Sequence, residues 1–312
     1  MKTLIVGTGI IGVIYGWALA QAGMDVTHFV RQGRREQCKT GVNLDVLDER
    51  KGHPKYNRTR YDLKCVEAVS PEDGYELIIV PTNMHQTGAA LESLVPVSGQ
   101  ATFLILSGNW AGPGDIDRLL PRERYLMGYA DGGGTIRNGV YWVNLGAEIH
   151  LGAVDDQARD KLEQVKALFA QADMTPDIQE NIVHWLWQHA AGAIGFAMGF
   201  AKHGGIPTFL ADKELVRLCV RSTKELFKLC ELRGVDLKQF PEAGFINFPD
   251  WLVTFLARWN IGHREAAQRY SAHGASAGSQ QEMKMYYALV TQDAKRLDFA
   301  MPATQALSVY LQ

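Results

Sequence analysis

Apolar runs alternate with amphipathic stretches through the first half of this chain. Short apolar runs of strand length recur, and stretches with helical spacing of apolar residues follow them, at about residues 10–23 and at Gln86–Leu94. This alternation predicts parallel strands joined by helices, in a doubly wound sheet. The expected strands are Leu4–Val6, Asp25–Val30, Val42–Val46, Tyr75–Val80, Ala101–Leu106 and Tyr125–Tyr129, with Tyr141–Asn144 and Glu148–Leu151 as a hairpin or edge pair.

The second half of the chain has helical patterning throughout. No strong strand pattern occurs after Ile178, so we expect an α/β domain over residues 1–175 and an all-helical domain over residues 176–312, with the change between Asp173 and Glu180. A ligand site is expected in the cleft between the two domains. The predicted helices are Asp155–Ala172, Ile182–Lys202, Lys213–Arg233, Pro249–Asn260 and Ser279–Phe299.

Composition restricts the function classes. The chain has 312 residues, of which 46% are hydrophobic, enough to fill two cores. A net charge of −2 predicts no general affinity for nucleic acid, and no apolar run reaches membrane-spanning length. Four cysteines without metal-ligand spacing are interpreted as reduced thiols of a cytoplasmic protein that holds no metal; they are Cys38, Cys65, Cys219 and Cys230. The opening strand is interpreted as part of the fold rather than a signal peptide.

The first twelve residues contain a glycine pattern typical of dinucleotide-binding sites. The predicted strand Leu4–Val6 leads into a G-x-G-x-x-G sequence and then a helix, which is the context this pattern requires. The first glycine suits a tight turn, the second a close approach of the backbone to a pyrophosphate, and the third close packing of helix and strand. The predicted phosphate-binding residues are Gly7, Thr8, Gly9, Ile10, Ile11 and Gly12; a glycine turn in an unrelated α/β domain is the alternative.

The end of the second predicted strand indicates which dinucleotide is bound. Where NAD sites carry Asp or Glu, this chain has Arg31, followed by Arg34 and Arg35. A guanidinium can bind a 2′-phosphate as a fork, so we expect NADP(H), with Arg31 as the main contact and Arg34 as support. The alternative is a solvated basic loop. Two further loops leave predicted strand ends, and from them Pro81, Asn83, Gln86 and Asn109 complete the expected cofactor set.

These motifs resemble the ketopantoate reductase family. Gly7-x-Gly9-x-x-Gly12 with Tyr15-Gly16, Val30-Arg31-x-Gly33 and the Asn109–Gly112 turn are similar to motifs of that family. Trp187-Gln188-His189 occupies the place of its Trp-x-Lys, and Glu282 precedes Pro302 by the spacing it shows. The resemblance covers most of the chain and implies a Rossmann domain, then a helical domain like that of 6-phosphogluconate dehydrogenase, and NADPH-dependent reduction of a 2-oxo acid.

The chain departs from this family at several site positions. The general-acid Lys corresponds to His189, the Asn one turn later to Ala193, a Lys after the fourth strand to Asn83, and an Asn beyond Glu282 to Tyr287. A substrate-binding Ser corresponds to Tyr270 or Ser271. Asn109 and Glu282 are kept. The implied catalytic residues are therefore His189, Glu282 and Asn109, and the loss of positive charge argues against ketopantoate as substrate.

Two functions follow from these residues. The first is an NADPH-dependent oxidoreductase that transfers hydride to the C=O of a 2-oxo acid or related carbonyl, or to a C=N bond, with His189 as proton donor. The alternative is a non-catalytic NADP(H)-binding sensor or regulatory protein. The expected ligand is a small molecule, and a homodimer is left open. Residues Gly244–His263, rich in Phe and Trp, are interpreted as a lid, a subunit contact or ordinary packing.

Overall fold

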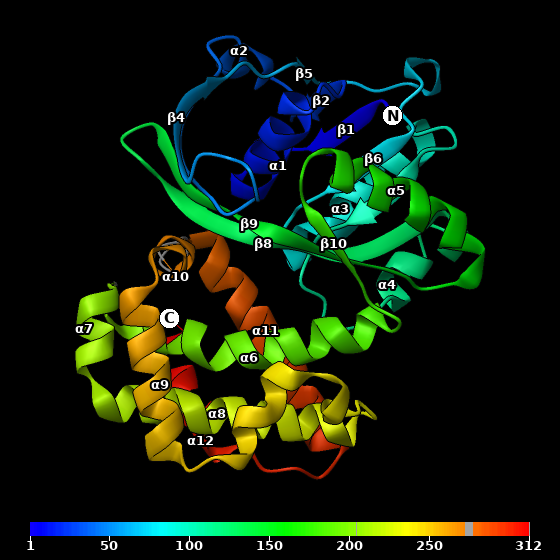
Figure 1. The fold of residues 1–312 in the computed structure, drawn as a ribbon. Helices are drawn as coiled ribbons and strands as arrows, with labels where there is room; N and C mark the ends of the chain where they lie inside the picture. The colour runs from blue at the N-terminus through cyan, green and yellow to red at the C-terminus, as the bar shows by residue number, and fades with distance from the viewer. Residues whose placement is uncertain (204, 272–276, 312) are drawn as a thin grey trace. The chain divides into compact units, whose positions relative to one another are not determined.

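The chain folds into two compact units in a computed structural model that describes residues 1–203, 205–271 and 277–311 (Figure 1). The first unit comprises residues 1–108 and 112–183, and the second comprises residues 109–111 and 184–312. The sequence placed the division at 175/176. Residues 175–178 instead form a strand that pairs with the sheet, which carries the first unit eight residues further.

A ten-stranded mixed sheet forms the centre of the first unit. Its order is β4-β3-β9-β8-β7-β6-β1-β2-β5, with β10 paired to β9. Strand β1 lies between β2 and β6, so the chain winds away from it in both directions, as the alternating pattern predicted. The strands are β1 (Thr3–Val6), β2 (Val26–Phe29), β3 (Val42–Asp48), β4 (Tyr56–Tyr61), β5 (Cys65–Val66), β6 (Leu77–Val80), β7 (Thr102–Ile105), β8 (Tyr125–Arg137), β9 (Val140–Ala153) and β10 (Thr175–Ile178).

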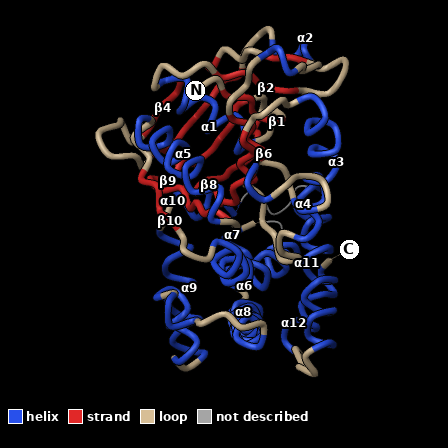
Figure 2. Tube along the Cα trace, turned by 90° about the vertical axis from the view of Figure 1, so that its right-hand side faces the viewer, coloured by secondary structure: helices blue, strands red, loops and turns tan. Residues whose placement is uncertain are grey.

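The strands at the centre of the sheet are buried on both faces. Every residue of β6 and β7 is buried, which explains why they form continuous apolar runs rather than alternating ones. Helices flank the strands in both views, and α1 packs with α5 through Tyr15 and Phe169, whose ring centroids are 6.0 Å apart (Figures 1 and 2). The helices of this unit are α1 (Ile10–Gln21), α2 (Arg35–Cys38), α3 (Met84–Leu94), α4 (Gly114–Asp117) and α5 (Arg159–Gln171).

The predicted hairpin within residues 141–151 is wrong. Those residues all belong to one long strand, β9, which runs antiparallel to β8. The turn between the two strands is at Asn138-Gly139. Asn138 and Gly139 both have positive φ angles, 50° and 77°, as a tight hairpin turn requires. Gly146, within this strand, makes room for the side chain of Asp131 on β8, because a Cβ there would overlap it.

The second unit is helical over its described residues. Helix α8 begins at an N-cap, Asp212, whose carboxylate accepts a hydrogen bond from the Leu215 amide. Glu225 of α8 accepts hydrogen bonds from the amides of Ala303 and Thr304, which fastens the first turn of α12. The helices are α6 (Ile182–His203), α7 (Ile206–Ala211), α8 (Lys213–Leu232), α9 (Asp250–His263), α10 (Glu265–Ser271), α11 (Ala277–Arg296) and α12 (Pro302–Leu307).

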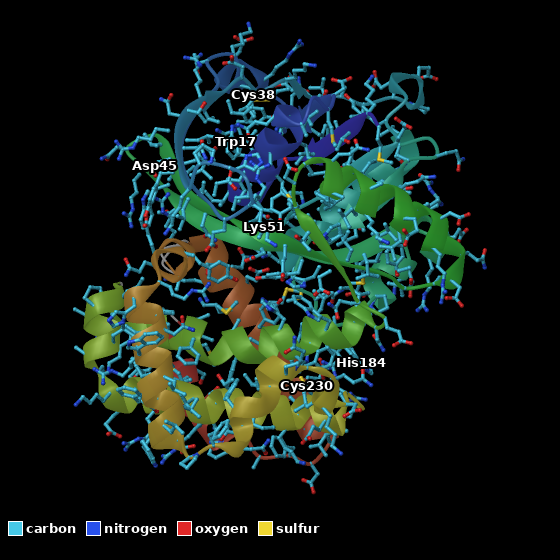
Figure 3. The ribbon with its side chains drawn as sticks, viewed as in Figure 1. Trp17, Cys38, Asp45, Lys51, His184 and Cys230 are labelled. Carbon is cyan, nitrogen blue, oxygen red and sulfur yellow. A yellow bond between two sulfur atoms is a disulfide. The ribbon has the colours of Figure 1, made fainter. Side chains whose placement is uncertain are left out.

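The expectation of four reduced thiols is wrong for two of them. Cys38, labelled in Figure 3, forms a disulfide with Cys65, although 27 residues separate them. They meet because α2 follows β2 closely and β5 pairs with β2. Spacing along the chain gave no signal of this pairing, since it depends on a strand of only two residues. Cys219 and Cys230 are free and buried, and burial raises the pKa of both thiols to about 12.

A buried histidine joins the first helix to the sheet. Burial lowers the pKa of His28 on β2, so its ring is neutral at neutral pH. Its Nε2 lies 3.1 Å from the hydroxyl of Tyr61. The ring lies directly against α1 at Gly16, where a Cβ would come within 2.7 Å of Nε2 and 3.0 Å of the Tyr61 hydroxyl. Only glycine at position 16 allows α1 to pack this closely.

Replacing Gly16 with alanine should therefore destabilise the first unit. We expect Gly16→Ala to lower the free energy of unfolding by about 1–3 kcal/mol, because the methyl group must displace His28 or shift the helix. The matched control is Gly88→Ala in α3, where a Cβ meets no atom within 4 Å. That control should gain roughly 0.5–1 kcal/mol from helix propensity. Urea denaturation measures both, and equal midpoints for the two variants would contradict this packing argument.

Candidate functional site

The glycine loop lies at the carboxyl end of β1, beside the point where the sheet changes direction. Gly7 has a φ angle of +84°, which only glycine adopts without strain, and its amide donates to the Phe29 carbonyl on β2 at 2.8 Å. At Gly12 a Cβ would lie 3.1 Å from the Gly7 carbonyl and 3.3 Å from the Ile5 side chain. The first and third glycines therefore have the local geometry that the sequence pattern required.

Two side chains that the sequence did not single out hold the carbonyl groups of this loop. The Nδ1 of His28 lies 2.9 Å from the Gly7 carbonyl, and the hydroxyl of Tyr141 donates to the Thr8 carbonyl at 2.9 Å. Because His28 is neutral and its Nδ1 faces an acceptor, its proton sits on Nδ1, and Nε2 accepts from Tyr61. Two carbonyl groups of the loop are therefore engaged by side chains of the first unit.

The start of α1 provides amide groups for an anion. Val13 makes the first intrahelical bond, to the Gly9 carbonyl, and no side chain caps the helix. The amides of Ile10, Ile11 and Gly12 therefore precede the hydrogen-bonded ladder at the positive end of the helix dipole. A Cβ built on Gly9 meets no atom within 4 Å, so the loop is open at this point. These features together match the geometry that binds phosphate groups.

The basic loop after β2 is exposed. Arg31 extends from the strand end into solvent, and the Arg34 amide closes the turn by donating to the Arg31 carbonyl at 3.0 Å. The fold brings an acidic residue, distant along the chain, close to this basic loop. Glu67, just after β5, accepts a hydrogen bond from the Arg35 amide at 2.8 Å. The Cys38–Cys65 disulfide lies in the same region, linking α2 to β5.

The loops after β6 and β7 are joined by hydroxyl groups. Thr87 on α3 lies 3.1 Å from the Thr82 hydroxyl and donates to the Ser107 hydroxyl at 3.2 Å. Parallel neighbours end at the same edge of a sheet, which brings these hydroxyls together. Of the predicted residues here, Pro81 lies against Gly12, Asn83 precedes α3, and Gln86 is exposed in its first turn. Short hydroxyl residues directly after two neighbouring apolar strands were the signal that could have found Thr82 and Ser107.

Residues 109–111 belong to the helical unit, although they follow a strand of the sheet. Trp110 is fully buried, and its indole Nε1 donates to Asp293 of α11 at 2.8 Å. Arg233, at the end of α8, donates to the Trp110 carbonyl at 3.0 Å and forms an ion pair with Asp293 at 3.2 Å. Asn109 is buried and directly precedes Trp110 in the chain. The contacts of Trp110 therefore determine where Asn109 is held within the helical unit.

Arg233 is the centre of an aromatic stack in the same unit. Its guanidinium lies 3.5 Å from the ring centroid of Trp187 and 4.6 Å from that of Trp110. His184, labelled in Figure 3, also stacks against Trp187, with ring centroids 5.5 Å apart. Burial and the nearby Arg233 lower the pKa of His184, and burial lowers the pKa of Arg233 itself. Because Asp293 already compensates the charge of Arg233, this arginine is a structural cation.

Two of the three predicted catalytic residues, His189 and Glu282, lie on helices of the second unit. His189 is a partly buried residue of α6, and its ring stacks on Trp185 with centroids 4.9 Å apart and an interplanar angle of 12°. Glu282 is a partly buried residue of α11, one turn before Tyr286. Burial, Glu282 and Tyr270 together raise the pKa of Tyr286 well above its ordinary value, so this hydroxyl stays protonated. The side chain of Ser271 lies outside the described residues.

The structure thus gathers the predicted residues into two groups. The glycine loop with Arg31, Arg34, Pro81, Asn83 and Gln86 lies in the first unit, around the ends of β1, β2 and β6, whereas Asn109, His189 and Glu282 lie in the second. Within the described part of the chain, no group of three or more His, Cys, Asp or Glu side chains is arranged to hold a metal ion. In that same part, no helix has the length and apolar character needed to cross a membrane.

Comparisons with known proteins place this chain beside ketopantoate reductases. Residues 3–156 match the family described as Ketopantoate reductase PanE/ApbA. A 2-dehydropantoate 2-reductase from Pyrococcus horikoshii is 26% identical over 251 residues, which cover 77% of each chain. The solved 2-dehydropantoate 2-reductase from Geobacter metallireducens superposes with a TM-score of 0.76 at 17% identity, over 100% of this chain and 99% of that one.

A second solved structure, a ternary complex of D-mandelate dehydrogenase with NADH and anilino(oxo)acetate, has a TM-score of 0.74 at 16% identity, covering 100% of this chain and 97% of that one. These likenesses agree with the fold. The chain is therefore a divergent member of the ketopantoate reductase family, with the Rossmann and helical parts of a nicotinamide-dependent oxidoreductase.

Proposed function

We propose that this protein is an NADPH-dependent reductase of a 2-oxo acid or related carbonyl other than ketopantoate. The observation that carries the proposal is the glycine loop: its carbonyls are held by His28 and Tyr141, and the open amide end of α1 is left for a pyrophosphate. The bound nicotinamide would supply the hydride. The protein must then hold the cofactor, orient the acceptor carbon and provide a proton for the oxygen.

The residues of the first unit fit this cofactor. Gly7 to Gly12 would hold the pyrophosphate, and Pro81, Asn83 and Gln86 lie on the next strand end, where the nicotinamide half of a dinucleotide binds in such sheets. Arg31 would bind the 2′-phosphate of the adenosine ribose.

The second unit would supply the proton and bind substrate. His189 would be the general acid, since its stack on Trp185 restricts the direction of its ring and imidazole exchanges protons near neutral pH. Glu282 would orient that acid or bind a polar group of the substrate, and Asn109 would bond the substrate or the nicotinamide ribose. A sensor that only binds NADP(H) would need none of these three residues, which favours an enzyme.

The missing lysines at Asn83 and His189 argue against ketopantoate, a compact anion. Arg233 does not replace them, because Asp293 pairs with it and the two tryptophans cover its faces. We expect stereospecific transfer of deuteride from labelled NADPH to at least one member of a panel of 2-oxo acids, ketones and imines that includes bulky and aromatic side chains. On ketopantoate, kcat/KM should stay below about 10⁴ M⁻¹s⁻¹.

Mass spectrometry of the products and NADPH oxidation rates decide this test. No transfer to any acceptor, with NADPH bound tightly, would favour the sensor. A higher kcat/KM on ketopantoate would overturn the substrate proposal and leave the reductase proposal intact.

Removal of Arg31 should change cofactor choice. Losing a charged bidentate contact costs about 2–4 kcal/mol, so Arg31→Ala should weaken NADPH binding roughly 30- to 1000-fold and leave NADH binding nearly unchanged. The control is Arg118→Ala, which removes an exposed arginine paired with Asp115 elsewhere in the first unit. Fluorescence titration with both cofactors measures the effect. Equal affinities for NADPH and NADH in the unmutated protein would refute a 2′-phosphate site at Arg31.

Removal of His189 should slow the chemical step. General acids contribute about 10²–10⁴-fold, so His189→Ala should lower kcat by that factor with little change in NADPH affinity. His189→Lys should keep part of the activity and move the pH optimum upward, because an ammonium holds its proton to higher pH. In the unmutated protein, kcat should fall as the imidazole loses its proton on the alkaline side.

The control for this test is His184→Ala, which removes the other histidine that stacks on a tryptophan of α6. Its kcat should remain within the range of the unmutated protein. If His189→Ala keeps full kcat instead, the proton comes from another group, of which the protonated Tyr286 is the next to test.

A further inference from the structure

A disulfide fastens the turn that follows the basic loop, residues 31–34, to the sheet. Cys38 is the last residue of α2, the single helical turn directly after this loop, and it is bonded to Cys65 of β5. Figure 1 shows α2 beside β5, which is the end strand of the sheet. The Sγ atom of Cys38 lies 3.8 Å from the Arg34 carbonyl, so the bridge lies against the backbone of the loop itself.

Strand β5 holds the loop at both of its ends. Where the loop begins, the Val30 amide donates to the Val66 carbonyl at 2.9 Å. Beyond its end, the disulfide joins Cys38 to Cys65, the neighbour of Val66. Between these two points the side chains from Arg31 to Glu36 are exposed, whereas Cys38 is buried. The shape of the loop therefore depends on how its ends are held rather than on core packing of its own side chains.

A weaker interaction also connects α2 to the chain beyond β5. The Arg35 amide donates to Glu67 at 2.8 Å, and this hydrogen bond is exposed. An exposed hydrogen bond contributes little net stability, and a helix of four residues does not persist without tertiary contacts. If the disulfide opens, residues 31–38 should therefore sample more conformations than they do in the oxidised protein.

The two sulfur atoms differ in their access to a reductant. Cys38 is 6% exposed, whereas Cys65 is more exposed. A thiolate of a dithiol reductant should attack Sγ of Cys65: a new S–S bond forms, the bond to Cys38 breaks, and Cys38 leaves as a thiolate that takes up a proton. The second thiol of the reductant then closes the reductant's own disulfide and releases Cys65 as a thiol. Two electrons and two protons pass to the protein.

We propose that Cys38 and Cys65 form a reversible thiol–disulfide site that sets the affinity of this protein for NADPH. The oxidised form holds Arg31 and Arg34 in place for the 2′-phosphate, and reduction by a dithiol releases them. This inference rests on the proposed function, because it needs a 2′-phosphate site at Arg31. Ordering a single residue costs about one factor of ten in binding, so reduction should weaken NADPH binding about 10-fold. NADH has no 2′-phosphate and should be affected much less.

The same coupling must act in the opposite direction. Linkage between two binding events is reciprocal, so a ligand that binds the oxidised form about 10-fold more tightly makes the disulfide harder to reduce by the same factor. For a two-electron couple this factor lowers the reduction potential by about 30 mV. NADPH should therefore protect the disulfide from reduction, and NADH should protect it much less.

Fluorescence titration of the full chain with both cofactors, before and after reduction by dithiothreitol, tests the proposed change in affinity. Alkylation in denaturant followed by mass spectrometry should count two free thiols in the oxidised protein and four in the reduced one. The variant Cys38→Ser, Cys65→Ser should bind NADPH as the reduced protein does and ignore dithiothreitol. Arg31→Ala should lose most of the response. The control is Cys230→Ser, which removes a free thiol and should keep the response.

Equilibration of the unmutated protein in mixtures of reduced and oxidised dithiothreitol, with and without saturating NADPH, measures the reciprocal effect. This measurement does not depend on the folding of any variant. An oxidised protein that prefers NADPH to NADH, with a preference that reduction leaves unchanged, would overturn this proposal and leave the 2′-phosphate site intact. Equal affinities for the two cofactors in the oxidised protein would overturn both. Four free thiols after equilibration with oxidised dithiothreitol would overturn the thiol–disulfide site alone.

Discussion

The close approach of helix α1 to the sheet is the constraint on which the first unit depends. Gly12 brings the start of the helix against β1, and Gly16 lets the next turn pass the buried ring of His28. A side chain at either position would push α1 outward and carry its amide groups away from the strand ends. The same histidine that limits the helix also holds the Gly7 carbonyl, so packing and loop geometry depend on one residue. The phosphate-binding geometry is thus a result of core packing.

The helical unit obtains its order from a different kind of interaction. Arg233 is largely buried, and such a charge is tolerated only when it is paired and its hydrogen bonds are made. Asp293 pairs with the charge, the Trp110 carbonyl accepts one hydrogen bond and two aromatic rings pack on the group, whereas the Nη1 nitrogen is buried without a hydrogen-bond partner among the described residues. These contacts also position Asn109 of the predicted site, because Trp110 is next to it in the chain. The tryptophan at position 110 therefore has a structural role within this protein.

Exposure also distinguishes the tryptophans of this chain. Trp110 and Trp185 are buried, in keeping with ordinary core residues, whereas Trp251 and Trp259 face solvent on α9. Residues Gly244–His263 are therefore not explained by ordinary packing alone. Composition could not separate these cases, because a tryptophan on a helix has the same pattern whether its neighbours are core residues or water. Which side of a helix is buried depends on the other elements that pack against it.

The sequence by itself determined the features that depend on neighbours along the chain. It predicted the parallel strands β1, β2, β6 and β7, the glycine loop with its following helix and the helical second half, since apolar periodicity and glycine chemistry are local. The family resemblance likewise rested on short motifs.

Only the tertiary structure decided what depends on distant segments meeting. It paired Cys38 with Cys65, placed His28 and Tyr141 under the loop, joined Thr82 to Ser107 through Thr87, extended the sheet through β10 and fastened Trp110 to Arg233 and Asp293. Each of these contacts joins residues that are separated along the chain, and no local pattern encodes which distant partner a side chain meets once the strands and helices have packed.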